Sequence, residues 1–345
     1  MAIGSVVIGG DNPVALQSMA NTDTTDVDAT IAQIGRMVEL GCDLARVSVP
    51  DEQSAAAFSA IKQSVSVPLI ADIHFNPDLA LAAIEAGADK IRLNPGNINA
   101  RERIAPVAKE LAGRKIPVRV GVNAASISHE FKQLYQEDPV KAIVESAHRY
   151  VEILRDFGVE DIVVALKSSD VLETIECYRR YAAESDLPLH VGITEAGPGI
   201  TGAARSAVGI GILLAEGLGD TVRASLSGGV EDEIVVCREI LASLGLREAP
   251  RLVACPTCAR AEFDVAAMAD EIRTRVMTLS KSVSVAIMGC VVNGPGEAEH
   301  ADAGIISVNG KFMIYRAGKV IGKGLDQADA LRALLSEIES LETEQ

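Results

Sequence analysis

The chain has 345 residues, is 48% hydrophobic and carries a formal net charge of −16 at pH 7. It contains no Trp and only 3% aromatic residues, so Ala, Val, Ile and Leu must build its core. The negative charge disfavours binding to nucleic acid or to an anionic membrane. The sequence shows neither an apolar run long enough to span a bilayer nor a secretory signal. We therefore expect a cytoplasmic protein whose six cysteines are thiols or ligands.

Short β-branched segments alternate with Ala-rich helical segments over most of the chain. They predict strands at residues 14–19, 44–49, 69–74, 90–94, 118–123, 162–167, 189–194 and 221–226. Eight such strand–helix units in succession favour an α/β fold, a (β/α)8 TIM barrel. An open doubly wound sheet is the alternative, but no Gly-x-Gly-x-x-Gly turn follows the first predicted strand.

The alternating pattern ends near residue 248, and the remainder predicts a small α+β domain. We expect a helix at 262–279, a strand at 283–288 and a closing helix at 325–341. Asn309-Gly310 lies between two further β-type segments and predicts a hairpin. The predicted domains are thus a substrate-binding barrel at 1–248 and an α+β domain at 249–345.

Polar residues recur in the predicted strands and at their carboxyl ends, where TIM barrels place their active sites. Five strands carry a cation: Arg46, Arg92, Arg119, Lys167 and Arg223. Burying one cation without a partner costs several kcal/mol, so binding of an anion such as phosphate would explain all five. Further polar residues accompany them: Asp72, His74, Asn94, Asn123, Glu195 and Ser225.

Each of these residues also has a simpler interpretation. Some arginines could pair with acidic residues inside the barrel, and His74 could be a hydrogen-bonded structural histidine. Glu195 could transfer protons or form a salt bridge to an arginine. Lys167 could bind phosphate, form an ion pair, or form a Schiff base as aldolases do.

Cys255-Pro-Thr-Cys258 and Cys290 lie in the predicted small domain without a fourth cysteine nearby. Three thiolates can hold an iron–sulfur cluster and leave one iron open for a weaker ligand. A structural zinc site completed by a histidine such as His300 is the alternative. Cys42, Cys177 and Cys237 lack ligand spacing and are expected to act as small apolar residues.

Several motifs together resemble one family. They are Gln17-Ser-Met19, Ala71-Asp-Ile-His74-Phe, Arg92-Leu-Asn-Pro-Gly-Asn97, Gly192-Ile-Thr-Glu195-Ala, Ala254-Cys-Pro-Thr-Cys258 and Gly289-Cys-Val-Val-Asn-Gly-Pro-Gly-Glu297-Ala. Nearly the whole chain resembles the hydroxymethylbutenyl diphosphate synthases, in their shorter bacterial form. These are iron–sulfur enzymes of the non-mevalonate isoprenoid pathway. One departure is Ala20, where the family pattern leads us to expect Thr.

The resemblance implies a reaction and a set of roles. The substrate would be 2-C-methyl-D-erythritol 2,4-cyclodiphosphate, opened and dehydroxylated with two electrons to 4-hydroxy-3-methylbut-2-enyl diphosphate. A [4Fe–4S] cluster would be held by Cys255, Cys258, Cys290 and, as an exchangeable ligand, Glu297. Arg46, Arg92, Arg119 and Lys167 would hold the diphosphate with Asn94, Asn123 and Ser225, and His74 would contact the substrate. Glu195 would transfer protons, and Asn293 would lie beside the cluster.

The resemblance also implies partners. These are a flavodoxin or ferredoxin electron donor and a second copy of the chain, with one subunit's barrel facing the other's cluster domain. Because such donors are acidic, we expect a basic docking face at the hairpin cations Lys311, Arg316, Lys319 and Lys323. The alternative function is a Schiff-base aldolase-type barrel with a structural zinc domain.

Overall fold

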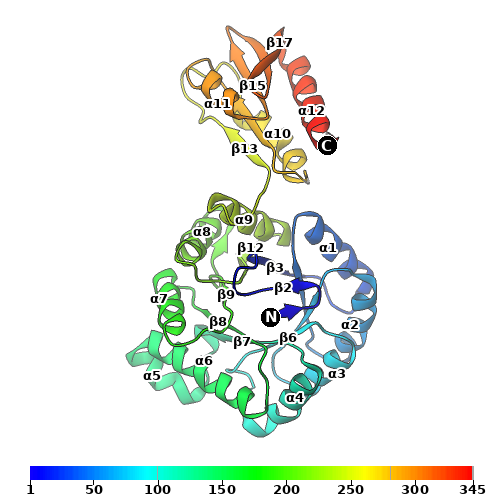
Figure 1. Ribbon diagram of the computed structural model, residues 1–345, viewed down its shortest axis with the longest axis vertical. Helices are drawn as coiled ribbons and strands as arrows, with labels where there is room; N and C mark the ends of the chain where they lie inside the picture. The colour runs from blue at the N-terminus through cyan, green and yellow to red at the C-terminus, as the bar shows by residue number, and fades with distance from the viewer. Residues whose placement is uncertain (99, 280, 344–345) are drawn as a thin grey trace. The chain divides into compact units, whose positions relative to one another are not determined.

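The computed structural model describes residues 1–98, 100–279 and 281–343, and the chain divides into two compact units, Met1–Arg247 and Glu248–Gln345 (Figure 1). Within the described residues, every helix is too short or too polar to cross a membrane.

The first unit is built on one parallel eight-stranded sheet. Its strands pair in the order β8-β7-β6-β5-β4-β3-β11-β9. A single parallel bridge between Val164 and Leu189 joins the two ends, so the sheet closes into a barrel. The strands are β3 (Ala15–Met19), β4 (Leu44–Ser48), β5 (Leu69–Ile73), β6 (Lys90–Leu93), β7 (Val118–Asn123), β8 (Ile162–Lys167), β9 (His190–Val191) and β11 (Thr221–Val222).

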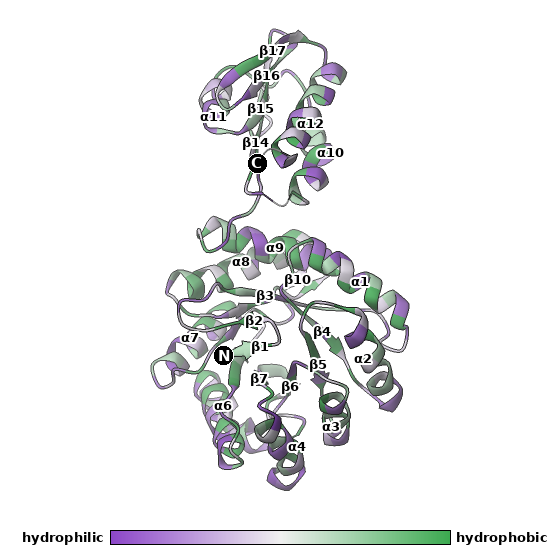
Figure 2. Cartoon of the chain, turned by 45° about the vertical axis from the view of Figure 1, so that its right-hand side comes forward, coloured by the Kyte–Doolittle hydropathy of each residue, from purple (hydrophilic) through white to green (hydrophobic). Residues whose placement is uncertain are grey.

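Eight longer helices surround this barrel, one after each strand (Figure 1). Several begin at an acidic or amide side chain that accepts a backbone N–H, as Asp26 does from Ala29 and Asp51 does from Ser54. Hydrophobic and hydrophilic residues alternate along these helices, while the strands are mostly hydrophobic (Figure 2). The helices are α1 (Val27–Glu39), α2 (Glu52–Ser64), α3 (Pro77–Glu85), α4 (Arg101–Arg114), α6 (Pro139–Asp156), α7 (Val171–Ala182), α8 (Gly199–Ala215) and α9 (Val230–Ser243); a short α5 (Lys132–Glu137) precedes α6.

The amino-terminal end of the barrel is closed by apolar side chains. A hairpin of β1 (Ala2–Ile3) and β2 (Val6–Val7) lies across it, near the N label in Figure 1. Ile3 and Ile8 are fully buried in one cluster with barrel residues that include Leu44 and Ile70. Water and ligands are therefore excluded from this end.

Beyond that apolar layer, the barrel interior becomes polar. Lys90 is fully buried, and its Nζ donates to Gln17 Oε1 at 3.3 Å. His190 is also fully buried, with Nδ1 2.7 Å from Thr221 Oγ1. Burial and neighbouring cations hold the pKa of both Lys90 and His190 well below their usual values. This polar layer lies below the strand cations Arg46, Arg92, Arg119, Lys167 and Arg223.

The second unit is a five-stranded mixed sheet, in the order β13-β14-β15-β16-β17. The first three strands are parallel and the last three form antiparallel hairpins. The helices α10 and α12 share a core with the sheet that includes Ile272, Phe312 and Leu334. The elements are β13 (Arg251–Ala254), α10 (Val265–Met277), β14 (Ser284–Met288), α11 (Gly294–His300), β15 (Ala303–Val308), β16 (Lys311–Arg316), β17 (Lys319–Leu325) and α12 (Gln327–Thr343).

The predicted fold class, a TIM barrel followed by a small α+β domain, is confirmed. Asn309 and Gly310 form the predicted turn with positive φ angles of 55° and 73°. The last two barrel strands are shorter than predicted, because the chain leaves the ladder at Gly192 and Arg223. The β1–β2 hairpin, β13, α11 and β17 were not predicted.

Candidate functional site

A cavity of about 210 Å³ lies at the carboxyl ends of the barrel strands. All five predicted strand cations line it, contributed by β4, β6, β7, β8 and the segment after β11. Its lining consists of Arg46, Asp72, His74, Arg92, Arg119, Gly121, Val122, Asn123, Ala165, Lys167, Thr194, Arg223 and Ser225.

Asp72 is the acidic residue that the cations share inside the cavity. It is 3% exposed, and its Oδ1 accepts from Arg92 Nη1 at 3.0 Å. Its Oδ2 lies 3.8 Å from Arg46 Nε and 3.5 Å from His74 Nε2. Burial alone would raise the pKa of Asp72, but the charges of Arg46 and Arg92 outweigh it and hold that pKa well below its usual value.

Arg223 is held by a second acid that sequence reasoning missed. Glu233 accepts from Arg223 Nε at 3.1 Å and from Nη2 at 3.2 Å, a two-pronged contact. Glu233 is buried in the first turn of α9 and also accepts from the backbone N–H of Leu226 at 3.1 Å. An acid in a first helical turn is ordinarily solvent-exposed, so the sequence carried no signal for this contact.

Arg119 and Lys167 form no ion pair within the described residues. Arg119 is 3% exposed, and its Nε and Nη1 are buried without a hydrogen-bond partner. Lys167 is half-buried, and burial together with Arg119, Arg223 and Arg46 lowers its pKa well below the usual value. These two donors are therefore the ones that an anionic ligand would satisfy.

The remaining predicted contact residues lie in different positions. Asn123 and Ser225 line the cavity, and Asn123 Nδ2 donates to Thr194 Oγ1 at 3.5 Å. Asn94 is not in the lining; its side chain accepts from Gly96 N and donates to Ser126 Oγ, both at 2.9 Å, which holds the loop after β6. Glu195 is exposed and has a positive φ of 52°, which few residues other than glycine adopt.

The cysteines of the second unit lie on two adjacent turns. Cys255 follows β13 and Cys290 follows β14, which pair in parallel with Ala254 opposite Ile287. Gly289 N donates to Cys255 Sγ at 3.2 Å, and Glu262 N donates to Gly289 O at 3.0 Å. A Cβ at Gly289 would lie 3.1 Å from Ala261 Cβ, so glycine permits the close approach of the two turns.

The other predicted cluster residues lie on the same two turns. Cys258 is exposed, Asn293 directly precedes α11, and Glu297 is exposed in the first turn of α11. No three His, Cys, Asp or Glu side chains within residues 1–98, 100–279 and 281–343 lie close enough to hold one metal ion. The donors fit an iron–sulfur cluster in type, because thiolates are its usual ligands; Cys258 is exposed, and Cys255 and Cys290 are partly buried.

The four hairpin cations predicted as part of a docking face lie along β16 and β17. Lys311 pairs with Val308 at one end of the β15–β16 hairpin, whereas Arg316 pairs with Lys319 at the opposite end of β16. Two of these cations are also neutralised locally, Lys311 by Asp326 at 2.6 Å and Arg316 by Glu337 at 2.8 Å. The docking face stays a prediction, and two of its four cations have an acidic neighbour.

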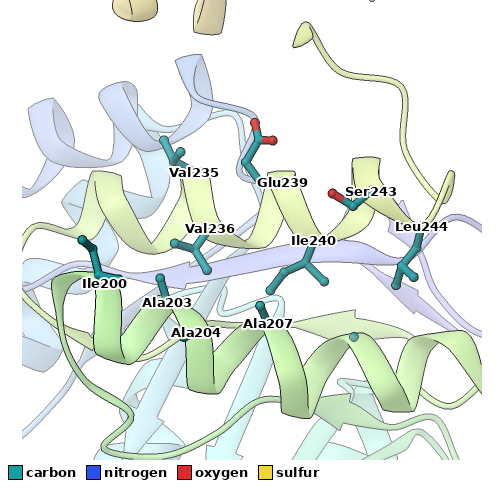
Figure 3. A pocket seen from close by; sticks show the side chains of 11 residues that line it. Ile200, Ala203, Ala204, Ala207, Val235, Val236, Glu239, Ile240, Ser243 and Leu244 are labelled. Atoms are coloured by element: carbon teal, nitrogen blue, oxygen red, sulfur yellow. The ribbon is translucent and has the colours of Figure 1, made fainter. Parts of the chain in front are cut away.

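An apolar groove of about 490 Å³ lies between α8 and α9 on the outside of the barrel. Figure 3 shows small side chains of α8, such as Ala203 and Ala207, facing Val236 and Ile240 of α9. Ile200 at the start of α8 is 90% exposed. Exposed apolar surface of this kind is typical of interaction sites.

The geometry thus defines a two-domain protein with a cationic cavity in an α/β barrel and cysteine turns in a small α+β domain. Residues 1–238 match the GcpE TIM-barrel domain and residues 251–340 the GcpE protein C-terminal domain. The chain therefore belongs to the GcpE family.

Curated relatives agree with this assignment, and a solved structure shares the barrel fold. Two proteins named 4-hydroxy-3-methylbut-2-en-1-yl diphosphate synthase (flavodoxin) are similar to it over nearly their whole length. The one from Geobacillus thermodenitrificans is 46% identical (99% of this chain, 91% of the relative), and that from Caldanaerobacter subterraneus is 47% identical (99% and 97%). The dihydropteroate synthase of Yersinia pestis, solved with a sulfonamide drug complex, shares the barrel fold at 13% identity, with a TM-score of 0.50 over 68% of this chain and 95% of that chain. The family resemblance read from the sequence is confirmed.

Proposed function

We propose that this protein converts 2-C-methyl-D-erythritol 2,4-cyclodiphosphate to 4-hydroxy-3-methylbut-2-enyl diphosphate in isoprenoid precursor synthesis. In this reaction two electrons and two protons break one ring C–O bond and release one oxygen as water. The relatives' names support the assignment. The observation that carries it is Arg119, a buried cation whose guanidinium faces a small cavity with unsatisfied donors.

The diphosphate is held by the cavity cations. Arg119 and Lys167 supply charge with which no carboxylate among the described residues forms an ion pair, and Arg46 and Arg92 are positioned beside them by Asp72. Guanidinium groups suit phosphate oxygens because their N–H groups form a rigid fork. Asn123 and Ser225 line the same cavity and supply neutral hydrogen bonds, and His74 lies at its edge against Arg92 at 2.9 Å. Asn94 contributes indirectly, through the loop that it holds.

The cysteine turns hold a [4Fe–4S] cluster through Cys255, Cys258 and Cys290. Glu297 completes the ligand set, since a carboxylate is a weaker ligand than a thiolate and can be exchanged. Asn293 lies on the same turn as Glu297. When bound, such a cluster supplies electrons one at a time. The cytoplasm suits this chemistry because it keeps thiols reduced.

Proton transfer falls to Glu195. Its carboxyl group lies on the exposed segment after β9, at the carboxyl end of the barrel, where substrates bind in this fold. The left-handed backbone at Glu195 projects this side chain from a strained turn, and strain of this kind is often retained at functional positions. A carboxyl group in reach of the leaving oxygen would protonate it as water forms.

A flavodoxin or ferredoxin delivers the electrons, and the protein acts as a homodimer. The groove between α8 and α9 supports association with a second copy, since it is apolar and Glu239 is its one charged lining residue within the described part of the chain. Two chains of net charge −16 approach most readily through a face that carries little charge.

Turnover of the cyclodiphosphate tests the proposed function. Anaerobically purified protein should be brown and should convert the cyclodiphosphate when dithionite and a mediator supply electrons. Protein that holds iron and sulfide but leaves the cyclodiphosphate unchanged would refute the activity. A colourless protein with one tightly held zinc would refute the cluster, and borohydride trapping of a carbonyl substrate at Lys167 would favour the aldolase alternative.

A further inference from the structure

The cavity contains more positive than negative groups. Its lining holds four arginines and Lys167 but only one acid, Asp72. Asp72 forms ion pairs with two of the arginines, Arg92 at 3.0 Å and Arg46 at 3.8 Å. Glu233, which is not part of the lining, forms an ion pair with Arg223 at 3.1 Å. Arg119 and Lys167 therefore share an enclosed space with no acid of their own within the described residues.

Only one of these two groups can relieve the excess charge by losing a proton. A guanidinium stays protonated in proteins, whereas a buried ammonium releases its proton readily. Lys167 is surrounded by cations on neighbouring elements: Arg119 on β7, Arg46 on β4 and Arg223 after β11. The fully buried His190 on β9 and Lys90 on β6 lie in the polar layer below and add no negative charge.

The nearby groups that could carry a negative charge do not neutralise Lys167. Glu233 on α9 is committed to Arg223 and to the N–H of Leu226. The thiol of Cys237 on α9 donates no charge, because burial raises its pKa to about 12. Gly192 after β9 brings backbone rather than a charged side chain against Lys167.

We propose that Lys167 is uncharged in the free protein and takes up one proton when the cavity binds a diphosphate. The two negative charges of the ligand replace the missing acid, so that the ammonium becomes favourable in the complex. The proton comes from solvent and returns to it when the diphosphate product leaves, so no electron or covalent bond is involved. The proposal rests on the proposed function for the identity of its ligand, since it requires a diphosphate in this cavity.

Calorimetry measures this coupling directly. The cyclodiphosphate is titrated into anaerobic holoprotein without a reductant, so that it binds but is not converted. Each of its phosphates is bonded to one ester oxygen and to the shared bridging oxygen and carries no proton that titrates near neutral pH, so any proton uptake belongs to the protein. Repeating the titration at pH 7.5 in buffers of different ionisation enthalpy gives the number of protons bound with each ligand. We expect between about 0.5 and 1 proton for the natural chain.

Two substitutions of Lys167 distinguish the effect of a positive charge at this position from the effect of gaining a proton there. Lys167→Arg should still bind the cyclodiphosphate but without proton uptake, because its charge is permanent. Lys167→Met should lose uptake and bind about tenfold more weakly or worse. The dissociation constant of the natural chain should rise by up to about tenfold per pH unit above neutral, while that of Lys167→Arg stays nearly flat.

Lys90→Met is the matched control, because Lys90 is buried in the same barrel but does not line the cavity. It should retain proton uptake. Binding without uptake in the natural chain, or uptake that survives in Lys167→Arg, would overturn the proposal and leave the proposed function intact. Absence of any cyclodiphosphate binding would instead refute the proposed function, and the proton coupling with it.

Discussion

Gly192 lies directly against Lys167, so that a Cβ at residue 192 would be 2.6 Å from Lys167 Nζ. The same Cβ would lie 2.3 Å from the backbone oxygen of Arg223. Glycine at this position therefore lets two strands and the lysine converge at the carboxyl end of the barrel. The segment Gly192-Ile-Thr-Glu195 was one of the motifs that indicated the family. Its first residue is thus glycine for a steric reason.

Gly192→Ala should weaken diphosphate binding and lower the melting temperature together. The clash with the Arg223 backbone cannot be relieved by a side-chain rotation, so β9 and β11 must separate locally. Thermal unfolding with and without cyclodiphosphate measures both effects. Gly35→Ala is the control, since no atom lies within 4 Å of its added Cβ, and in the exposed middle of α1 it should stabilise by about 0.5–1 kcal/mol. If Gly192→Ala and Gly35→Ala changed the melting temperature and the binding equally, residue 192 would not lie as close to Lys167 and the Arg223 backbone as the structure places it.

Asp72→Asn should destabilise the protein by about 3 kcal/mol, because it leaves Arg46 and Arg92 buried without their shared acid. The pKa of Asp72 is lowered in the fold, so its contribution to stability is present above its unfolded pKa of about 3.9 and is lost as pH falls through the lower folded value. Urea unfolding between pH 7 and pH 3 should therefore show a difference in the free energy of unfolding between the two proteins. This difference should stay constant over most of that range and become smaller only near pH 3. The exposed Asp28→Asn should show no comparable gap.

Cysteine alkylation should divide the six thiols into two equal groups. Burial raises the pKa of Cys42, Cys177 and Cys237 to about 12, so few thiolates form there near neutral pH. In folded, cluster-free protein, iodoacetamide should modify only Cys255, Cys258 and Cys290, as peptide mass spectrometry would show. Bound cluster should protect those three. Rapid modification of Cys42 in the native fold would contradict the burial.

Cys290→Ala and Glu297→Ala should differ in what they remove. A lost thiolate should abolish cluster binding, whereas loss of the weaker carboxylate should leave most of the iron and sulfide but lower turnover by at least about tenfold. Iron and sulfide content of anaerobically reconstituted protein, measured beside turnover, distinguishes them. Glu299→Ala, an exposed acid on the same helix, should change neither. Equal cluster loss in the Cys290 and Glu297 variants would rule out an exchangeable carboxylate.

Ile200→Asp should convert a dimer to a monomer, because it places a charge at the edge of the apolar groove between α8 and α9. Light scattering coupled to size-exclusion chromatography should report about half the molar mass. Leu172→Asp is the control, since Leu172 is 74% exposed on α7 and outside the groove. If both variants keep the mass of the natural chain, the second copy does not bind at this face.

The sequence predicted the barrel well because parallel strands buried on both faces read as short, apolar β-branched runs. All eight predicted barrel strands are present, although β9 and β11 contain only two residues each. The strand β17 escaped prediction, since its Gly-containing segment is exposed at a sheet edge and lacks an alternating pattern. The β1–β2 hairpin escaped because two-residue strands leave almost no periodicity to detect.

The candidate site was predicted through its cations, which stood out because they interrupt apolar runs. What the sequence could not supply was the pairing among them. Glu233 reads as an ordinary helix-start acid, yet it neutralises Arg223, and Asn94 reads as a strand-end ligand, yet its amide holds a loop. That Arg119 and Lys167 remain without an acid follows only from these three-dimensional contacts.

Because the β1–β2 hairpin closes the amino-terminal end with apolar side chains, ligand and solvent share the opening at the carboxyl ends of the strands. A bound diphosphate would then displace water from the cavity lining, at Arg119 and Lys167, above the polar layer. Lys90 and His190 are fully buried without a ligand, so they stay dry whether the site is full or empty. Departure of the product would thus return water to the cations of the lining but not to the layer beneath them.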